Sequence, residues 1–238
     1  MSKRPVKPKA RSAANAGSRN PAPDSPRLAA EFLKSAAKLS QCPPETGPEI
    51  AFAGRSNAGK SSVLNRLTGN RRTAKVSKQP GRTQLLNFFD VPGTQGRLVD
   101  LPGYGYAQAG KSAQAAWQQT VNDYLNNRDA LAGIVLVMDI RHPLQPFDIE
   151  LIEWADPSEL PLRILLNKAD KLKRGAQGKV LQQVRNAVDG AALTSVQVFS
   201  AASGQGLPEL VATLSEWLSA EAAEEAAEEA TKEPTADN

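Results

Sequence analysis

From residue 49 onward, short apolar runs alternate with longer segments that carry apolar residues at helical spacing. The run at 134–138, Ile-Val-Leu-Val-Met, is typical of a strand buried on both faces of a sheet. Alternating strands and helices favour a mostly parallel sheet covered on both faces. The predicted strands cover residues 50–53, 85–91, 97–101, 134–138, 163–166 and 195–199, and the predicted helices cover residues 60–67, 112–126, 147–154, 178–188 and 207–218.

This pattern predicts one α/β domain at residues 48–219, with three layers, α/β/α, and a mostly parallel six-stranded sheet. In residues 27–47, apolar residues at amphipathic spacing follow a Ser-Pro pair, which predicts an N-terminal helix and lead-in. Residues 1–26 have almost no large apolar side chains, so we expect a disordered basic arm. Residues 220–238 are rich in Ala and Glu, and we expect a solvated acidic tail.

Between the first strand and the first helix of the domain, eight residues match the phosphate-loop pattern GxxxxGK[ST]. Glycines allow a tight turn whose backbone N–H groups point at phosphate oxygens, and the following helix adds its positive dipole end. We expect Lys60 to reach the β- and γ-phosphates and the Ser61 hydroxyl to bind Mg²⁺. The predicted phosphate-loop residues are Gly54, Arg55, Ser56, Asn57, Ala58, Gly59, Lys60 and Ser61.

Two segments at the ends of later strands indicate which nucleotide is bound. Residues 167–170 read Asn-Lys-Ala-Asp, and the carboxylate of Asp170 can accept both N1–H and N2–H of guanine. Adenine does not offer this pair of donors, so it would leave Asp170 unpaired, and the alternative of a small ATPase is disfavoured. We expect the Asn167 amide to bind the other purine edge, the Lys168 stem to lie along the base, and residues 200–202 to form a second base-side loop.

Two further segments are placed to sense the γ-phosphate. Asp100 ends the third predicted strand in the sequence Asp-Leu-Pro-Gly, where we expect it to hold Mg²⁺ through water. The backbone N–H of Gly103 is expected to contact the γ-phosphate, and Thr83 to complete the Mg²⁺ shell. A segment ordered by γ-phosphate and Mg²⁺ and released after hydrolysis is a switch. The motifs together predict a P-loop NTPase with a Ras-like GTPase domain.

Longer stretches carry a closer resemblance: residues 51–62, 80–84, 98–107 (LVDLPGYGYA) and 138–144 (MDIRHPL). Over roughly residues 45–218 the chain resembles the EngB (YihA/YsxC) family of bacterial GTPases. The resemblance implies a switch in large ribosomal subunit assembly, needed for normal septation and cell division, with that subunit or its rRNA and proteins as partner. It places Mg²⁺ on Ser61 and Thr83. Outside the phosphate loop it places nucleotide contacts on Gly81, Arg82, Thr83, Gln84, Leu85, Asp100, Leu101, Pro102, Gly103, Asn167, Lys168, Ala169, Asp170, Phe199, Ser200, Ala201 and Ala202.

Tyr104 stands where Ras-like GTPases carry the glutamine that orients the attacking water. A phenol ring cannot both donate and accept as a carboxamide does, so we expect slow intrinsic hydrolysis, with Lys60, Thr83, Gly103 and Asn57 as catalytic candidates. Asn57 either helps to bind K⁺ beside the phosphates, as in related GTPases with a similar loop, or only stabilises the loop. Tyr104 either stacks on a partner or packs in the core. A second hypothesis is a module whose nucleotide gates binding to RNA or protein, with incidental hydrolysis.

The net charge of +4 is unevenly distributed. Residues 1–20 hold six basic residues and no acidic ones, whereas residues 216–238 hold eight acidic residues and one lysine. The remaining middle carries +5, which suits RNA, although on charge alone a solvated surface is the simpler interpretation. No apolar run approaches the ~20 residues of a membrane span, and the single cysteine excludes an internal disulfide. We expect a cytoplasmic monomer.

Overall fold

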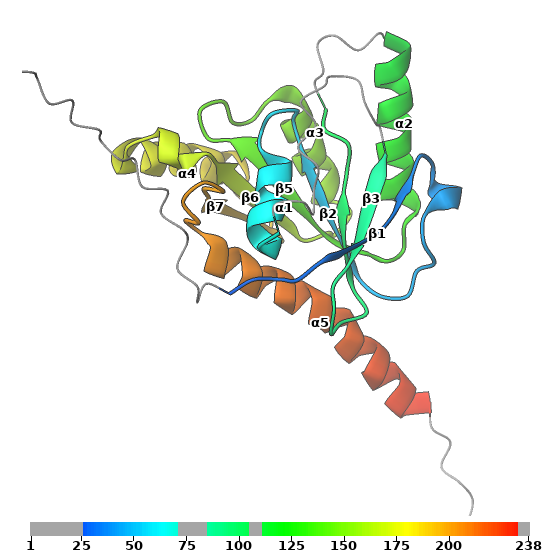
Figure 1. The fold of residues 1–238 in the computed structure, drawn as a ribbon. Coiled ribbons are helices and arrows are strands. Elements are labelled where there is room, and N and C mark those ends of the chain that lie inside the picture. Colours follow the sequence, from blue (N-terminus) through cyan, green and yellow to red (C-terminus); the bar gives the residue numbers. More distant parts are fainter. Residues whose placement is uncertain (1–25, 71–84, 105–110, 233–238) are drawn as a thin grey trace, which may run out of the picture.

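The computed structural model describes residues 26–70, 85–104 and 111–232, which form one sheet flanked by helices (Figure 1). The sheet has seven strands in the order β1-β3-β4-β2-β5-β6-β7. The strands are β1 (Glu31–Ala36), β2 (Glu49–Gly54), β3 (Leu86–Asp90), β4 (Arg97–Asp100), β5 (Leu131–Asp139), β6 (Leu162–Asn167) and β7 (Thr194–Val198). The helices are α1 (Lys60–Thr68), α2 (Lys111–Asn127), α3 (Pro146–Ala155), α4 (Arg174–Ala187) and α5 (Leu207–Lys232), with 3-10 turns η1 (Leu39–Gln41) and η2 (Ala169–Lys171).

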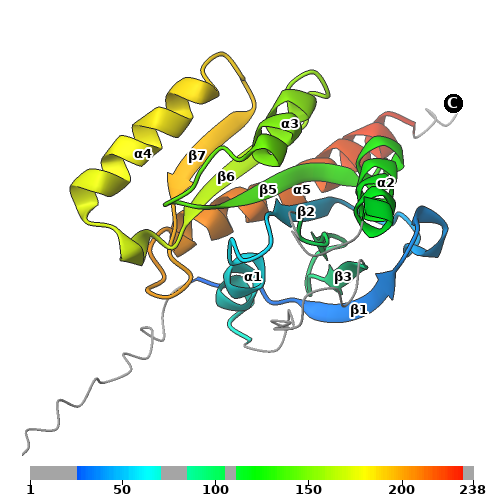
Figure 2. The same cartoon turned by 90° about the horizontal axis from the view of Figure 1, so that it is seen from above.

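The predicted α/β/α architecture is confirmed, because the helices divide between the two faces of the sheet (Figure 2). Side chains of α2, α3 and α4 pack on one face, and those of α1 and α5 pack on the other. The interior strand β5 shows why both faces are covered. Ile134, Leu136 and Met138 enter the first core, whereas Val135 and Val137 enter the second. This period of two explains the continuously apolar run in the sequence.

The predicted N-terminal helix is wrong: β1 is a strand, and only the short turn η1 is helical between residues 27 and 47. The predicted six-stranded sheet therefore has seven strands. β1 pairs antiparallel with β3, with a register shift between Phe32 and Lys34. The Phe32 ring meets the Phe89 ring edge-on at 5.8 Å, and Ser35 Oγ donates to Asn87 Oδ1 at 2.7 Å. Pairing with an otherwise open sheet edge outweighed the local helical spacing.

The parallel strands β2, β4, β5 and β6 run in one direction, so their carboxyl ends meet at one edge of the sheet. The phosphate loop, residues 100–103 and residues 167–170 follow the ends of β2, β4 and β6, and residues 199–202 follow the neighbouring parallel strand β7, as expected for ligand sites of open α/β sheets. At the far end of the chain, α5 continues to Lys232, beyond the predicted helix end at residue 218 (Figure 1). Among the described residues, no helix has the length and apolar character needed to cross a bilayer.

Candidate nucleotide site

The phosphate loop connects β2 to α1 at the carboxyl edge of the sheet. β2 ends at Gly54 and α1 begins at Lys60, with Gly59 as its N-cap at φ +99°. A side chain at Gly59 would be strained at this φ, and its Cβ would lie 2.4 Å from Nδ2 of Asn167. Asn57 also adopts a positive φ, +67°. The loop is thus held in a tight turn that directs the α1 N-terminus toward the site.

Lys60 and Asp100 lie together beside this loop. The parallel register of β2 and β4 aligns Phe52 with Asp100, and Leu101 N–H donates to the Phe52 carbonyl at 3.0 Å. The Lys60 ammonium donates to Asp100 Oδ1, and both side chains are largely buried. The geometry therefore brings the predicted phosphate-binding lysine next to the predicted Mg²⁺-linked carboxylate.

Asn167 joins the phosphate loop to the predicted base-side loop. Its side chain is buried, Nδ2 donates to the Ala58 carbonyl at 2.9 Å, and Oδ1 accepts from the Ala201 N–H at 3.2 Å. The sequence predicted that this amide binds a purine edge, but the structure uses both of its polar groups to hold two loops together. Fixing two loops of a binding site relative to each other is preorganisation, which lowers the cost of binding.

Asp170 and Ser200 face each other from the two predicted base loops. Ser200 Oγ donates to Asp170 Oδ1 at 2.7 Å, and Lys171 Nζ lies 3.2 Å from Asp170 Oδ2. Burial alone would raise the pKa of Asp170, but the Ser200 hydrogen bond and Lys171 outweigh it and lower the pKa. The carboxyl group is therefore ionised at neutral pH, which is compatible with the predicted role of Asp170 as a hydrogen-bond acceptor.

Lys168 connects the phosphate loop to the end of β5. Its backbone lies in the left-handed region, at φ +64°. Its Nζ donates hydrogen bonds to the Asn57 carbonyl at 2.5 Å and to Asp139 Oδ2 at 3.0 Å. Arg141 also binds Asp139, with its guanidinium nitrogens 2.9 and 2.6 Å from the two carboxylate oxygens. Burial opposes ionisation of Asp139, yet hydrogen bonds from Arg141 and Lys168 hold its pKa well below the ordinary value.

Two residues of the site, Arg66 and Asp139, are not among the predicted site residues. Arg66 of α1 donates from Nε to the Ala201 carbonyl at 2.6 Å and from Nη2 to the Ala202 carbonyl at 2.5 Å. Asp139 ends β5 and fixes Lys168. Arg66 lies in the last turn of α1, where a basic residue interacts favourably with the helix dipole. That interaction alone accounts for an arginine at this position, so the sequence did not indicate its contact with a loop 135 residues away.

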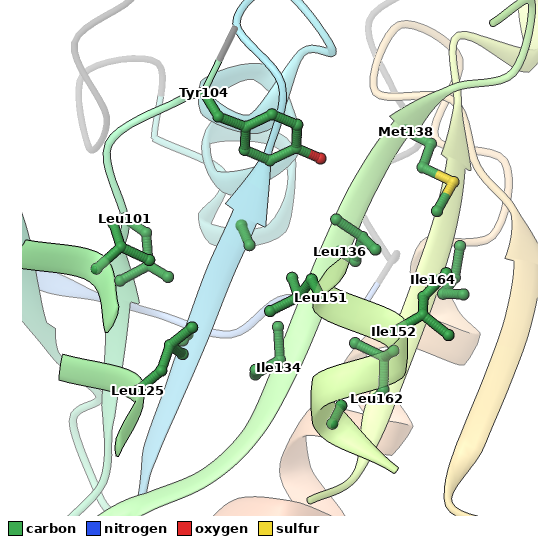
Figure 3. Close-up of a cluster of buried hydrophobic side chains, with 14 of the residues drawn as sticks. Leu101, Tyr104, Leu125, Ile134, Leu136, Met138, Leu151, Ile152, Leu162 and Ile164 are labelled. Carbon is green, nitrogen blue, oxygen red and sulfur yellow. The ribbon is translucent and has the colours of Figure 1, made fainter. Parts of the chain in front are cut away.

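Tyr104 is buried rather than exposed at the site. Only 5% of it is accessible, and its ring packs 4.2 Å from the Phe147 ring, with its hydroxyl donating to Asp148 Oδ1. In Figure 3 the ring lies above Leu136 and Leu151, at the end of a row of buried apolar side chains. The structure thus favours core packing over stacking on a partner.

The other predicted contacts divide into two groups. Gly103 lies against the phosphate loop, because a Cβ on it would be 3.4 Å from Cα of Ser56. Leu85 directly precedes β3, and Phe199 is buried after β7, with its N–H donating to the Leu166 carbonyl at 3.0 Å. Four predicted contacts, one of them also a predicted Mg²⁺ ligand, lie outside the described residues: Gly81, Arg82, Thr83 and Gln84.

Comparison with known proteins places this site in a class. A family described as 50S ribosome-binding GTPase matches residues 49–168, half of the chain. A crystal structure of a probable GTP-binding protein EngB has the same fold, with a TM-score of 0.59 and 23% identity over 71% of this chain and 98% of that one. Era bound to MgGDPNP and part of 16S ribosomal RNA matches with a TM-score of 0.57 and 23% identity, over 73% of this chain and 57% of Era. Fold and site define a GTP-binding P-loop GTPase.

Closer relatives define the family within this class. A probable GTP-binding protein EngB from Coxiella burnetii is 50% identical over 81% of this chain and 94% of the relative. The Nitrosococcus oceani protein of the same name is 50% identical over 79% of this chain and 94% of its own length. A third, from Acinetobacter baylyi, is 51% identical over 76% and 77%. The chain belongs to the EngB family of GTP-binding proteins.

Proposed function

We propose that this GTPase is a nucleotide-dependent switch that acts on the large ribosomal subunit, its rRNA or its proteins during assembly. The observation that supports this most directly is the match of residues 49–168 to the family described as 50S ribosome-binding GTPase. Those residues hold the phosphate loop and the segment from Asp100 to Gly103. The protein would act in the cytoplasm as a monomer, and normal septation and cell division would depend on the subunits whose assembly it serves.

We further propose Ser61, Asp100 and Thr83 as the residues that hold Mg²⁺. The hydroxyl and carboxylate oxygens of Ser61 and Asp100 suit this cation, which prefers oxygen ligands. Ser61 follows Lys60 in the first turn of α1, and Lys60 contacts Asp100, so both oxygen donors come from segments next to the phosphate loop. When bound, Mg²⁺ neutralises charge on the β- and γ-phosphates.

The remaining roles follow from the donors and acceptors at the site. The Lys60 ammonium and the Gly103 N–H would bind phosphate oxygens, and the ionised Asp170 would accept the two N–H groups of guanine. Asn57 would place K⁺ next to the phosphates. Asn57 lines a pocket of about 170 Å³ between the phosphate loop and the end of β5. Equal GTPase rates in K⁺ and Na⁺ would argue against that cation role.

The burial of Tyr104 favours a second candidate function. With its hydroxyl on Asp148 and its ring in the core, Tyr104 is not placed to orient an attacking water. Intrinsic turnover would then be slow, and the nucleotide would mainly gate affinity for RNA or protein. Stimulation of GTP hydrolysis by ribosomal particles would favour the assembly switch over this binding module.

Co-sedimentation with purified ribosomal subunits tests the main proposal. The protein is mixed with large or small subunits at physiological salt, with a non-hydrolysable GTP analogue, with GDP or without nucleotide. We expect selective co-sedimentation with the large subunit in the presence of the analogue. An Asp170→Asn variant, which replaces the guanine acceptor by an amide donor, should lose this nucleotide dependence.

The reverse results would count against the proposal. Binding that ignores the nucleotide, equal binding to the small subunit, or no binding at physiological salt would shift the role to another partner. Repeating the measurement at several salt concentrations separates specific binding from charge attraction, because phosphate contacts weaken steeply as salt rises.

A further inference from the structure

The backbone of Tyr104 is joined directly to the phosphate loop. Its carbonyl accepts the Ser56 N–H at 2.7 Å, and residues Arg55 and Tyr104 form an isolated parallel bridge. Gly103, one residue earlier, therefore lies next to the loop, close to Ser56. Because neighbouring Cα atoms are about 3.8 Å apart, any shift of Tyr104 is passed to the Gly103 peptide.

The side chain of Tyr104 is anchored at the opposite end, in α3. Its ring lies 4.2 Å from that of Phe147, and its hydroxyl donates to Asp148 Oδ1 (Figure 3 shows the buried ring). The hydroxyl and the carbonyl of Tyr104 thus attach one residue to two different elements, α3 and the phosphate loop. Because both the backbone and the hydroxyl of Tyr104 are held, its side chain has little freedom to change rotamer.

Asp148, the hydrogen-bond partner of Tyr104, is buried at the start of α3. Only 1% of it is accessible, and its Oδ2 accepts the Gln145 N–H at 2.9 Å, within a capping box that begins α3. Within the part of the chain that the structure describes, no lysine or arginine forms an ion pair with Asp148. Burial raises its pKa, while hydrogen bonds from Tyr104 and the Gln145 N–H and, to a smaller extent, the charge of Arg55 oppose that rise. The two neutral donors make the direct contacts with the carboxyl group.

We propose that Tyr104 and Asp148 form a positioning pair that fixes the Gly103 N–H relative to the phosphate loop and thereby sets the preference for GTP over GDP. This inference rests on the proposed function in one respect, the contact of Gly103 with the γ-phosphate. The γ-phosphate is the group that GDP lacks, so a displaced Gly103 weakens GTP binding and leaves GDP binding nearly unchanged. Tyr104 then acts through a neighbour, which is a different role from that of the glutamine it replaces.

The test compares affinities of the full-length protein for GDP and for a non-hydrolysable GTP analogue, each with Mg²⁺. Tyr104→Phe removes the hydroxyl and keeps the ring. Loss of a hydrogen bond to a buried acceptor should lower affinity for the analogue about tenfold, with GDP affinity changed by less than about twofold. Asp148→Asn tests the same pair from the other side and should shift the ratio of affinities in the same direction.

A matched control exists in the same protein. Tyr124 is also a buried tyrosine whose hydroxyl donates to a carboxylate, Glu49 Oε2 at 3.0 Å, at the opposite edge of the sheet. Tyr124→Phe makes the same chemical change far from the nucleotide. We expect it to lower the melting temperature comparably and to leave the ratio of analogue to GDP affinity unchanged.

Two outcomes would overturn the proposal. One is an equal loss of affinity for GDP and analogue in Tyr104→Phe, or the same ratio shift in Tyr124→Phe, since either would indicate a general effect of stability. The other is a Tyr104→Phe/Asp148→Asn double variant whose ratio shift is the product of the single shifts, because residues acting as a unit are not additive. These affinities are measured without ribosomal particles, so failure to bind the large subunit and failure of the pair are separate results.

Discussion

Two buried tyrosine–carboxylate pairs lie at opposite ends of the parallel strands, and the partners that surround the two carboxylates differ. At the amino end of β2, fully enclosed Glu49 accepts from Tyr124 at 3.0 Å and from Arg128 at 2.9 and 2.6 Å, with Arg97 at 3.5 Å. At the carboxyl edge, Asp148 accepts from Tyr104 and from a backbone N–H. The first carboxylate has two cationic partners, and the second has neutral donors.

We call the Glu49 cluster with Arg97, Arg128 and Tyr124 the anchor, and the Tyr104–Asp148 pair the sensitive contact. The guanidinium of Arg128 also donates to the Pro43 carbonyl at 2.8 Å, and that of Arg97 to the Pro44 carbonyl at 2.6 Å. Burial would lower the pKa of Arg128, but hydrogen bonding to Glu49 raises it overall. Each of these three charged side chains has an oppositely charged partner, and the cluster fastens the lead-in segment to the sheet. Among the described residues Asp148 has no ion pair, and Arg55 acts on it only as a weaker nearby charge, so we expect its surroundings to respond to the loss of a single hydrogen-bond donor.

The largest predicted effect is at the anchor. Glu49→Gln would leave the guanidinium of Arg128 buried with an amide in place of its carboxylate, and we expect a loss of about 3 kcal/mol in the free energy of unfolding. For a chain of this size that corresponds to a melting temperature roughly 6–12 °C lower. Thermal unfolding followed by circular dichroism measures the change.

The same variant sharpens the comparison through what it leaves intact. Glu49 lies at the opposite end of β2 from Gly54, so the ratio of GTP-analogue to GDP affinity should stay at the wild-type value below the melting transition. A changed ratio would mean that the two edges are coupled through β2, and the separation of anchor from sensitive contact would be lost.

The motifs of the candidate site could be predicted from the sequence because each is local and most follow strand ends. The phosphate loop and the base loops were found from residues within a few positions of each other, and β5 was found from its continuous apolar run. The N-terminal helix predicted within residues 27–47 is wrong because the spacing of Leu28 and Phe32 carries no information on the open edge of β3, with which residues 31–36 pair as a strand.

Long-range contacts of the site were not predictable for a related reason. Asp148 is 44 residues from Tyr104, and Asn167 is 109 residues from Ala58, so no local pattern predicts either contact. Tyr104 was recognised as a departure from the glutamine of Ras-like GTPases, and its two possible surroundings, partner or core, were equally compatible with the sequence. Burial against Phe147 distinguishes them.

A smaller effect is predicted for the base-side loop, and it should differ in kind from that of Tyr104. Arg66 holds the carbonyls of Ala201 and Ala202 with two nitrogens of one guanidinium, a geometry that lysine cannot reproduce. We expect Arg66→Lys to lower affinity about fivefold for GDP and GTP analogue alike, because the base is common to both. Fluorescent-nucleotide titration measures both constants. A loss restricted to the analogue would contradict the assignment of Arg66 to the base loop.

The smallest effects concern pH, and two carboxylates at the nucleotide edge should show opposite slopes. The pKa of Asp139 is lowered in the folded protein, because hydrogen bonds from Arg141 and Lys168 outweigh burial, so its contribution to stability is present above the ordinary value of 3.8 and lost below it. We expect Asp139→Asn to lower the melting temperature by about 2 °C at pH 7 and by less as the pH falls below 4.

Asp148 has a raised pKa, chiefly from burial, so the native state binds its proton more tightly than the unfolded chain does. Wild-type stability relative to Asp148→Asn should therefore increase as the pH falls from neutral toward 4. Melting temperatures of the three proteins at several pH values measure both slopes, and parallel slopes would show that the two carboxylates share one environment.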